Sequence, residues 1–177
     1  LKFSKIINSD LKKDNLNFGI IGNCKSSALI NDDSSIDWSC LPEFDSPSVF
    51  CKILDEKIGG SFKIDCDSSY SINQKYMEKT CILITTFQNS KNEFQVIDFM
   101  PRYQKENGIY YSPPQIVRVL KLIKGKPKFR VLYDPKLSFS LGKTNNYVKE
   151  NFIVSVLNED RYETLYLYTD LNKNIIL

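Results

Sequence analysis

Short apolar stretches of strand length, separated by turn residues, follow one another along most of this chain. Phe18–Gly22 and Ser27–Asn31 are the first two. The side chains of Asp32–Ser35 favour a turn, because they bond nearby backbone groups, and Ser35–Cys40 then alternates apolar and polar residues. We therefore predict that Ser27–Asn31 and Ser35–Cys40 pair as a hairpin.

The same spacing continues downstream and predicts a mostly β protein. Further strands are expected at Ser61–Asp65, Tyr70–Tyr76, Cys81–Gln88, Phe94–Met100, Gln115–Lys124, Lys128–Tyr133, Tyr147–Leu157 and Thr164–Thr169. Roughly ten strands are too many for one open sheet of this twist, so two packed antiparallel sheets are expected. Asn89–Asn92 has the length of a tight hairpin turn.

Three segments carry other patterns. Ser48–Leu54 follows Ser46-Pro47, and a proline near the first position favours one or two helical turns there. Gln115–Lys124 is apolar on both faces, which is typical of a central strand. The stretch from Pro101 to Pro114 is irregular and aromatic, and predicts a long loop.

Composition supports the same fold class. The chain has 11 Phe and 10 Tyr but only 2 Met, which favours pleated surfaces over helical bundles. Its 177 residues fit one hydrophobic core. We predict a polar leader at residues 1–13 and one domain at residues 14–177, a two-layer antiparallel β-sandwich with at most one or two short helices.

Charge and cysteine content exclude several functions. The 24 Lys and Arg are interspersed with 21 Asp and Glu, so nucleic acid is not an expected partner. The 5 cysteines form no C-x-x-C pair and the chain has no His, so we expect neither a mixed Cys/His zinc site nor any cofactor. We predict free thiols in a cytoplasmic protein. No apolar run approaches the ~20 residues that cross a bilayer.

The absence of histidine also removes the Ser/His/Asp and Cys/His nucleophilic triads. Paired carboxylates remain chemically possible, because Asp37, Glu43, Asp45 and Asp98 all lie close to aromatic residues in the sequence. The alternative interpretation for Asp37 and Asp45 is structural, since acidic residues beside turns commonly cap backbone amides.

Aromatic residues offer a second kind of chemistry. Trp38 either stacks on a sugar or belongs to the core, as a single Trp in an alternating strand commonly does. Tyr103, Tyr110 and Tyr111 lie in the predicted loop rather than in a core pattern. For these three, an interface or ligand role stands beside a purely structural one.

Several motifs resemble the amino-terminal domain of the glucoamylase and trehalase-type enzymes of glycoside hydrolase family 15. The longest is Ser-Ser-Ile-Asp-Trp-Ser-Cys-Leu-Pro-Glu-Phe-Asp-Ser-Pro at 34–47, preceded by Ile-Gly-Asn-Cys-Lys-Ser-Ser-Ala-Leu-Ile at 21–30. Shorter matches follow in order at Gly59–Phe62, Lys75–Met77, Val96–Pro101 and Ile116–Arg118. The resemblance runs almost from end to end.

This resemblance implies a super-β-sandwich that precedes, and packs against, a helical (α/α)6 barrel in the same protein. In the family the barrel holds the two carboxyl groups of an inverting hydrolysis, so this chain is expected to be non-catalytic. An α-glucan or trehalose substrate would then bind through the barrel. The residues expected near the barrel or its cleft are Asp37, Trp38, Glu43, Phe44, Asp45, Tyr103, Tyr110 and Tyr111.

The sequence departs from the family pattern at a few positions. Glu43 stands where the family has Arg, Asn23 stands where it has Asp, and Pro135–Phe139 replaces Pro-Arg-Phe-Asp-Tyr. A carboxylate role at Ser138 is therefore lost. Two hypotheses from other classes stay open: a stand-alone carbohydrate-binding module that uses Trp38 or the tyrosines, and a self-associating module that forms homo-oligomers through strand edges.

Overall fold

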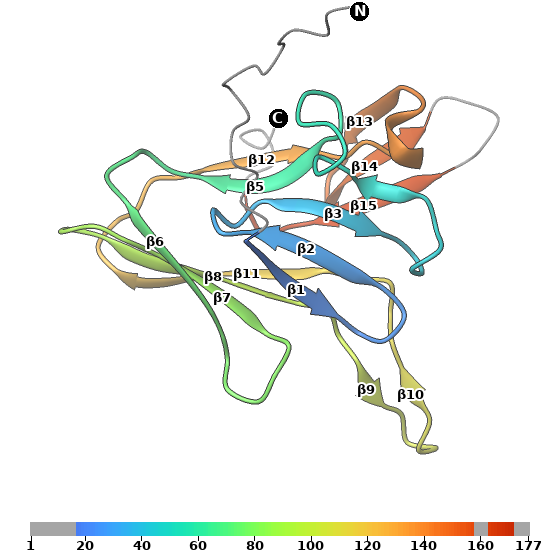
Figure 1. Ribbon diagram of the computed structural model, residues 1–177, viewed down its shortest axis with the longest axis horizontal. Coiled ribbons are helices and arrows are strands. Elements are labelled where there is room, and N and C mark those ends of the chain that lie inside the picture. The colour runs from blue at the N-terminus through green and yellow to red at the C-terminus, as the bar shows by residue number, and fades with distance from the viewer. Residues whose placement is uncertain (1–16, 158–162, 172–177) are drawn as a thin grey trace, which may run out of the picture.

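Antiparallel sheets make up the computed structural model, which describes residues 17–157 and 163–171 (Figure 1). The larger sheet has six strands: β1 (Phe18–Gly22), β2 (Ser27–Asn31), β3 (Ile36–Cys40), β5 (Ser61–Asp65) and β12 (Arg130–Asp134) in that order, with β4 (Ser48–Phe50) paired to β3. The four-stranded sheet has the order β11 (Val117–Lys124), β8 (Glu93–Phe99), β7 (Leu83–Gln88) and β6 (Ser71–Tyr76).

Two smaller units complete the fold. A three-stranded sheet is formed by β13 (Thr144–Val148), β14 (Phe152–Leu157) and β15 (Thr164–Tyr168). The short hairpin of β9 (Tyr103–Gln104) and β10 (Tyr110–Tyr111) extends away from the body (Figure 1), and the 3-10 turn η1 spans Ser138–Ser140. The prediction of a mostly β sandwich is confirmed, and the predicted leader at residues 1–13 lies outside the described residues.

The two large sheets form separate layers (Figure 1), and buried side chains from both of them, joined by residues of the small sheet, form the core. Its main cluster joins Ile21, Ile30 and Ile36 of the six-stranded sheet to Leu83 of the other sheet, all at most 1% exposed. A second cluster sets Ile64 against a stack of aromatic rings, in which Phe87 and Phe94 lie 4.8 Å apart and nearly parallel. Apolar burial between two layers thus stabilises the sandwich.

The predicted helical turns at Ser48–Leu54 are wrong. Residues 48–50 form β4, and Phe50 pairs with Ser39 of β3. The consecutive side chains Val49, Phe50 and Cys51 are all buried, so this segment has neighbours on both faces. That burial favours a strand more than the preceding proline favours a helical turn.

Two predictions of strand position also need correction. The single strand expected at Tyr147–Leu157 is a hairpin of β13 and β14, closed by a hydrogen bond from Lys149 N to Phe152 O of 2.8 Å. The strand expected to be central, β11, lies at the edge of its sheet and pairs only with β8 among the described strands. Val119, Leu122 and Ile123 are accordingly 43%, 61% and 44% exposed.

The aromatic segment from Pro101 to Pro114 is more regular than predicted. It contains the β9–β10 hairpin, in which Tyr103 pairs with Tyr111 and Tyr110 pairs with Gln104. Gly108 at its tip has a φ of +79°, a conformation that glycine adopts without strain, and its N–H bonds Lys105 O. The segment is therefore a short projecting arm.

Candidate functional site

Asp37, the first predicted site residue, is buried within β3 and only 3% exposed. Its carboxylate accepts hydrogen bonds from Ser35 Oγ and from Asn31 Nδ2, the latter at 3.2 Å. Lys52 Nζ lies 3.7 Å away. These partners belong to the β2–β3 turn and to the turn after β4, so the carboxylate holds the two turns together.

Trp38 is half-buried and points to the opposite face of the strand. Its ring centroid lies 6.3 Å from that of Phe139, which belongs to η1 and has a positive φ of 56°. Trp38 therefore packs against a turn from a distant part of the chain.

The loop after β3 is exposed, in contrast to β3 itself. Glu43, Phe44 and Asp45 all face solvent, and Phe44 is 60% exposed. Phe44 N donates to Lys25 O at 2.9 Å, and Lys25 Nζ lies 3.3 Å from Glu43 Oε1. Glu43 thus pairs with a lysine of the β1–β2 turn, in an exposed contact that contributes little to stability.

The β9–β10 hairpin presents the three predicted tyrosines together. Tyr103 and Tyr111 meet edge to face at 5.6 Å, and Lys105 Nζ lies 4.3 Å from the centroid of the Tyr111 ring. On the other side of the hairpin, Arg102 covers Tyr110 at 4.4 Å. Tyr103 and Tyr110 remain 52% and 59% exposed. Cation–π contacts order these rings without burying them.

Asn23 connects this hairpin to the β1–β2 turn. Its side-chain amide is 2% exposed and donates from Nδ2 to Pro113 O at 2.8 Å, while Ser112 Oγ donates to Asn23 O at 2.7 Å. Its Oδ1 accepts from the backbone N–H groups of Lys25 and Ser26, both at 3.1 Å. In the sequence, Asn23 carries no signal of this role beyond differing from the Asp of the resembled motif.

Three segments therefore meet at one end of the sandwich, which we call the loop end: residues 23–26, 41–47 and 101–114. Glu43, Phe44 and Asp45 lie at the same end as the three tyrosines. The segment at 41–47 contacts the β1–β2 turn at Lys25, and the hairpin contacts the same turn at Asn23. Asp37 and Trp38 are not part of this surface. The exposed character of the loop end makes it a candidate interaction site.

A buried ion pair, Asp98–Arg118, links the neighbouring strands β8 and β11 of the four-stranded sheet on its inner side. Arg118 Nε lies 2.8 Å from Asp98 Oδ1 and Nη2 lies 3.0 Å from Oδ2, and both side chains are at most 5% exposed. Arg118 also donates to Phe62 O at 2.8 Å and to Ser34 O at 2.6 Å. Four of the five guanidinium N–H donors are thus used within the protein.

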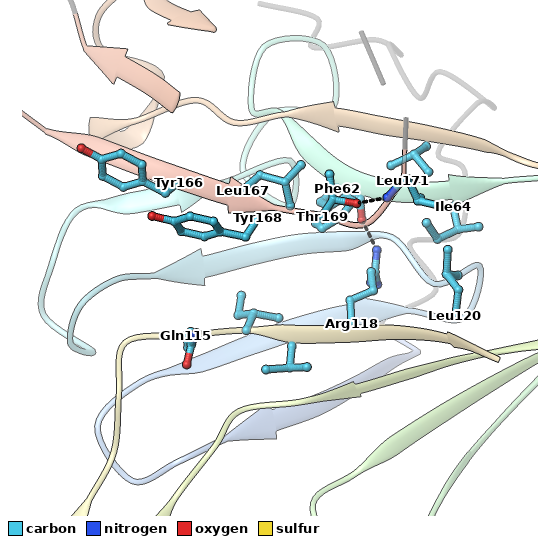
Figure 2. Close-up of a pocket in the computed structure, with 13 residues that line it drawn as sticks. Phe62, Ile64, Gln115, Arg118, Leu120, Tyr166, Leu167, Tyr168, Thr169 and Leu171 are labelled. Atoms are coloured by element: carbon cyan, nitrogen blue, oxygen red, sulfur yellow. Dashed lines mark hydrogen bonds between the residues drawn. The ribbon is translucent and has the colours of Figure 1, made fainter. Parts of the chain in front are cut away.

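A cleft of about 260 Å³ lies between β11 and β15, and Arg118 forms part of its wall (Figure 2). The remaining lining is mostly apolar or aromatic: Phe62, Ile64, Gln115, Ile116, Val117, Leu120, Val131, Tyr166, Leu167, Tyr168, Thr169 and Leu171. No Asp or Glu lines this cleft among the described residues. This lining suits an apolar segment better than a reacting sugar.

Comparison with known proteins decides the family. The family model described as trehalase-like, N-terminal, matches residues 15–159. The chain belongs to this family. Trehalase 2 of Sulfolobus acidocaldarius is 33% identical over 139 residues, which cover 78% of this chain and 22% of that protein. A trehalase of Thermoplasma acidophilum is 35% identical over 130 residues, 71% of this chain and 22% of its own length.

The shared region is a small part of these relatives. The trehalase of Thermoplasma volcanium is 42% identical over 87 residues, which are 47% of this chain and 14% of that protein. The chain spans about a fifth or less of the length of these three relatives. No solved structure matches it.

The thiols of this trehalase-like domain divide by burial. All five cysteines are free, with Cys24 and Cys81 exposed and Cys40 and Cys51 buried. Burial, together with the nearby carboxylate of Asp65, raises the pKa of Cys66 to about 11.

Within residues 17–157 and 163–171, no cluster of three or more Cys, Asp or Glu is arranged to hold a metal ion, and no helix has the length and apolarity that a bilayer crossing requires.

Proposed function

We propose that this chain is the non-catalytic amino-terminal domain of a glycoside hydrolase family 15 enzyme of the trehalase type. In that protein a carboxy-terminal (α/α)6 barrel cleaves the α-glucosidic bond, and this domain packs against it and shapes access to its cleft. The observation that carries the proposal is the family match at residues 15–159, in relatives called trehalases that are several times longer.

The arrangement of acids supports a non-catalytic role. Glycoside hydrolysis uses two carboxyl groups roughly 5–9.5 Å apart, on either side of the scissile bond. Here the cleft of Figure 2 has no carboxylate in its wall, and Asp37 is occupied by Ser35, Asn31 and Lys52. Asp98 is fully engaged by Arg118. None of these acids is available to a substrate.

The loop end supports the contact with a second domain. Tyrosine and arginine are enriched among the residues that dominate protein interfaces. The hairpin carries Tyr103, Tyr110 and Tyr111 beside Arg102, and the buried amide of Asn23 fixes its base. A rigid arm loses little conformational entropy when a partner covers it, which favours binding.

The first test is hydrolysis by the 177-residue chain. We expect no release of glucose from trehalose or maltose, and the same result for Asp37→Asn and Asp45→Asn. Hydrolysis by the pure chain that either substitution abolishes would refute the division of labour between the domains.

The second test uses the polypeptide translated from the complete reading frame. If the loop end borders the cleft and Tyr110 is an interface hot spot, Tyr110→Ser should raise KM for trehalose at least about fivefold, because truncating a hot-spot aromatic costs more than ~1 kcal/mol. Leu54→Ser is the control, since Leu54 is 68% exposed on a turn outside the loop end. Equal kinetics of both variants would place the cleft elsewhere.

A carbohydrate-binding function is the second candidate, and the exposed rings of Tyr103 and Tyr110 are the observation that favours it. Calorimetric titration of maltooligosaccharides into the chain should then give heat that Tyr110→Ser removes.

We also propose a cytoplasmic location, which five free thiols support because disulfides are rare in that compartment.

A further inference from the structure

The outer face of the β13–β14–β15 sheet is aromatic where a solvent-facing sheet is ordinarily polar. Directly paired residues of antiparallel strands share a face, so the pairs Tyr147–Val154, Val154–Tyr166 and Phe152–Tyr168 lie on one surface. We call these five residues the aromatic face.

The rings of this face are ordered but uncovered. Phe152 lies 5.5 Å from Tyr166 and 5.6 Å from Tyr168, and the two tyrosine rings are nearly parallel. Tyr147, Tyr166 and Tyr168 are nevertheless 47%, 50% and 68% exposed. A contiguous exposed patch of this kind marks an interaction site rather than an ordinary surface.

The opposite side of the same sheet is already used. Ile153 and Leu157 belong to the main core cluster, and Leu165 and Leu167 pack against it. Figure 2 shows Tyr166 and Tyr168 pointing the same way from β15, while Leu167 points the other way. The small sheet is thus apolar on both sides, as a layer between two packed bodies is.

The position of the face in the chain indicates its occupant. β15 is the last strand of the described chain, and Leu171, three residues after Tyr168, lies in the wall of the cleft beside it. In a protein of the relatives' length, the polypeptide that follows leaves beside this face. Tethering gives such a domain a high effective concentration there, which a separate partner lacks.

We propose that the aromatic face is the main docking surface for the domain that follows in the same polypeptide. This inference rests on the proposed function, and it adds that the small sheet, rather than the loop end alone, is covered. Tyrosine supplies large contact area with few rotatable bonds, so four aromatic rings and Val154 form a suitable interface centre.

The test is chemical footprinting of tyrosines. Tetranitromethane is applied to the 177-residue chain and to the polypeptide of the complete reading frame, and nitration at each tyrosine is followed by mass spectrometry. We expect Tyr147, Tyr166 and Tyr168 to react at least about tenfold more slowly in the longer polypeptide, because an interface centre excludes solvent. Tyr76, on β6 of the four-stranded sheet and 46% exposed, is the internal control.

Other outcomes overturn the inference. Unchanged nitration of the aromatic face in the longer polypeptide refutes it, and Tyr103 and Tyr110 report separately whether the loop end is covered. Protection that appears in the 177-residue chain as its concentration rises identifies a second copy as the occupant. Protection of that chain by added maltooligosaccharide identifies a sugar platform instead.

A variant adds an independent readout in the longer polypeptide. Tyr168→Asp should accelerate proteolysis between the two domains by about tenfold, because a charge in an apolar interface opposes docking. Leu54→Asp is the matched control, since Leu54 and Tyr168 are both 68% exposed. Equal proteolysis of the two variants counts against the aromatic face. The footprint needs no variant, so it decides the question even if Tyr168→Asp fails to fold.

Discussion

The interior contact between Asp98 and Arg118 and the aromatic face of the small sheet use their residues in opposite ways. The ion pair is at most 5% exposed and consumes nearly all of its hydrogen-bonding capacity within the domain. The aromatic face keeps tyrosines about half exposed or more, and its ring–ring contacts all lie within its own sheet. Through Phe62 O and Ser34 O, Arg118 of the pair joins the two large sheets, whereas the aromatic face is available to something outside them.

Residues of the resemblance motifs and residues of the exposed tyrosine surfaces also differ in where they lie in the sequence. Asp98 and Arg118 belong to the short motifs that carry the family resemblance, as do Asp37 and Asn23, and all four side chains are buried. The tyrosines of the β9–β10 hairpin and of β15 lie outside those motifs. The motifs therefore mix buried residues that maintain the frame with exposed ones such as Phe44, so a motif by itself does not locate the interaction surface.

The largest expected effect is loss of the ion pair. Arg118→Ala leaves the Asp98 carboxylate buried without a partner, so the free energy of unfolding should fall by ~3–5 kcal/mol. Urea denaturation of the 177-residue chain measures it. Arg130→Ala is the control, because Arg130 is 76% exposed and its pair with Asp65 is worth less than about 1 kcal/mol. Similar losses for the two variants would contradict the distinction.

Tyr133 gives a pH-dependent test of the interior. Burial raises its pKa from 10 to about 12, so the folded state holds the phenol proton more tightly than the unfolded state. Stability from this group is complete below pH 10 and is lost as pH rises from 10 towards 12, by roughly 3 kcal/mol in total. Tyr133→Phe should remove this part of the alkaline destabilisation in urea denaturation at pH 8 and pH 12. An unaltered pH dependence would contradict it.

A smaller effect is expected at the base of the hairpin. Asn23→Asp replaces the Nδ2 donor to Pro113 O with an oxygen, which should cost ~1–3 kcal/mol. Amide hydrogen exchange of residues 101–114 should become faster. Asn107→Asp is the control, because Asn107 uses only its Oδ1 acceptor, towards Ile109 N, and an aspartate keeps that acceptor. Unchanged exchange in Asn23→Asp would show that the hairpin does not depend on this tether.

The smallest effects belong to the exposed rings. Phe44→Ser and Tyr168→Ser should change the free energy of unfolding of the 177-residue chain by less than about 0.5 kcal/mol, because neither side chain supports the core. Urea denaturation checks both. A loss above ~2 kcal/mol would assign the ring in question to the frame rather than to an interaction surface.

Sequence patterns predicted the sandwich well, because alternation and turn residues report local geometry directly. The hairpin of β2 and β3 is an example, with its turn at Asp32–Ser35. The position of a strand was predicted wrongly where the same residue pattern fits two different structures. β11 is apolar on both faces, yet this composition suits an edge strand with exposed apolar residues as well as a central strand. The β13–β14 turn at Lys149–Asn151 was missed because it contains neither glycine nor proline.

The candidate site was less predictable than the fold. Phe44 and the tyrosines of the hairpin could be named from their loop positions, whereas their common tether through Asn23 required the pairing of β1 with β2. The aromatic face had no local signal, since Tyr147 and Tyr166 share a surface only through Val154. Whether the predicted contact residues touch a catalytic domain stays a prediction.

The free edge of β11 has a consequence for how the domain behaves in solution. Its register is interrupted between Leu122 and Lys124, and charged Lys121 and Lys124 lie along it. Such features discourage a neighbouring chain from extending the sheet, which is the usual route to fibrils. Association of two copies through the β11 edge is therefore disfavoured, even though this edge carries exposed apolar side chains such as Leu122.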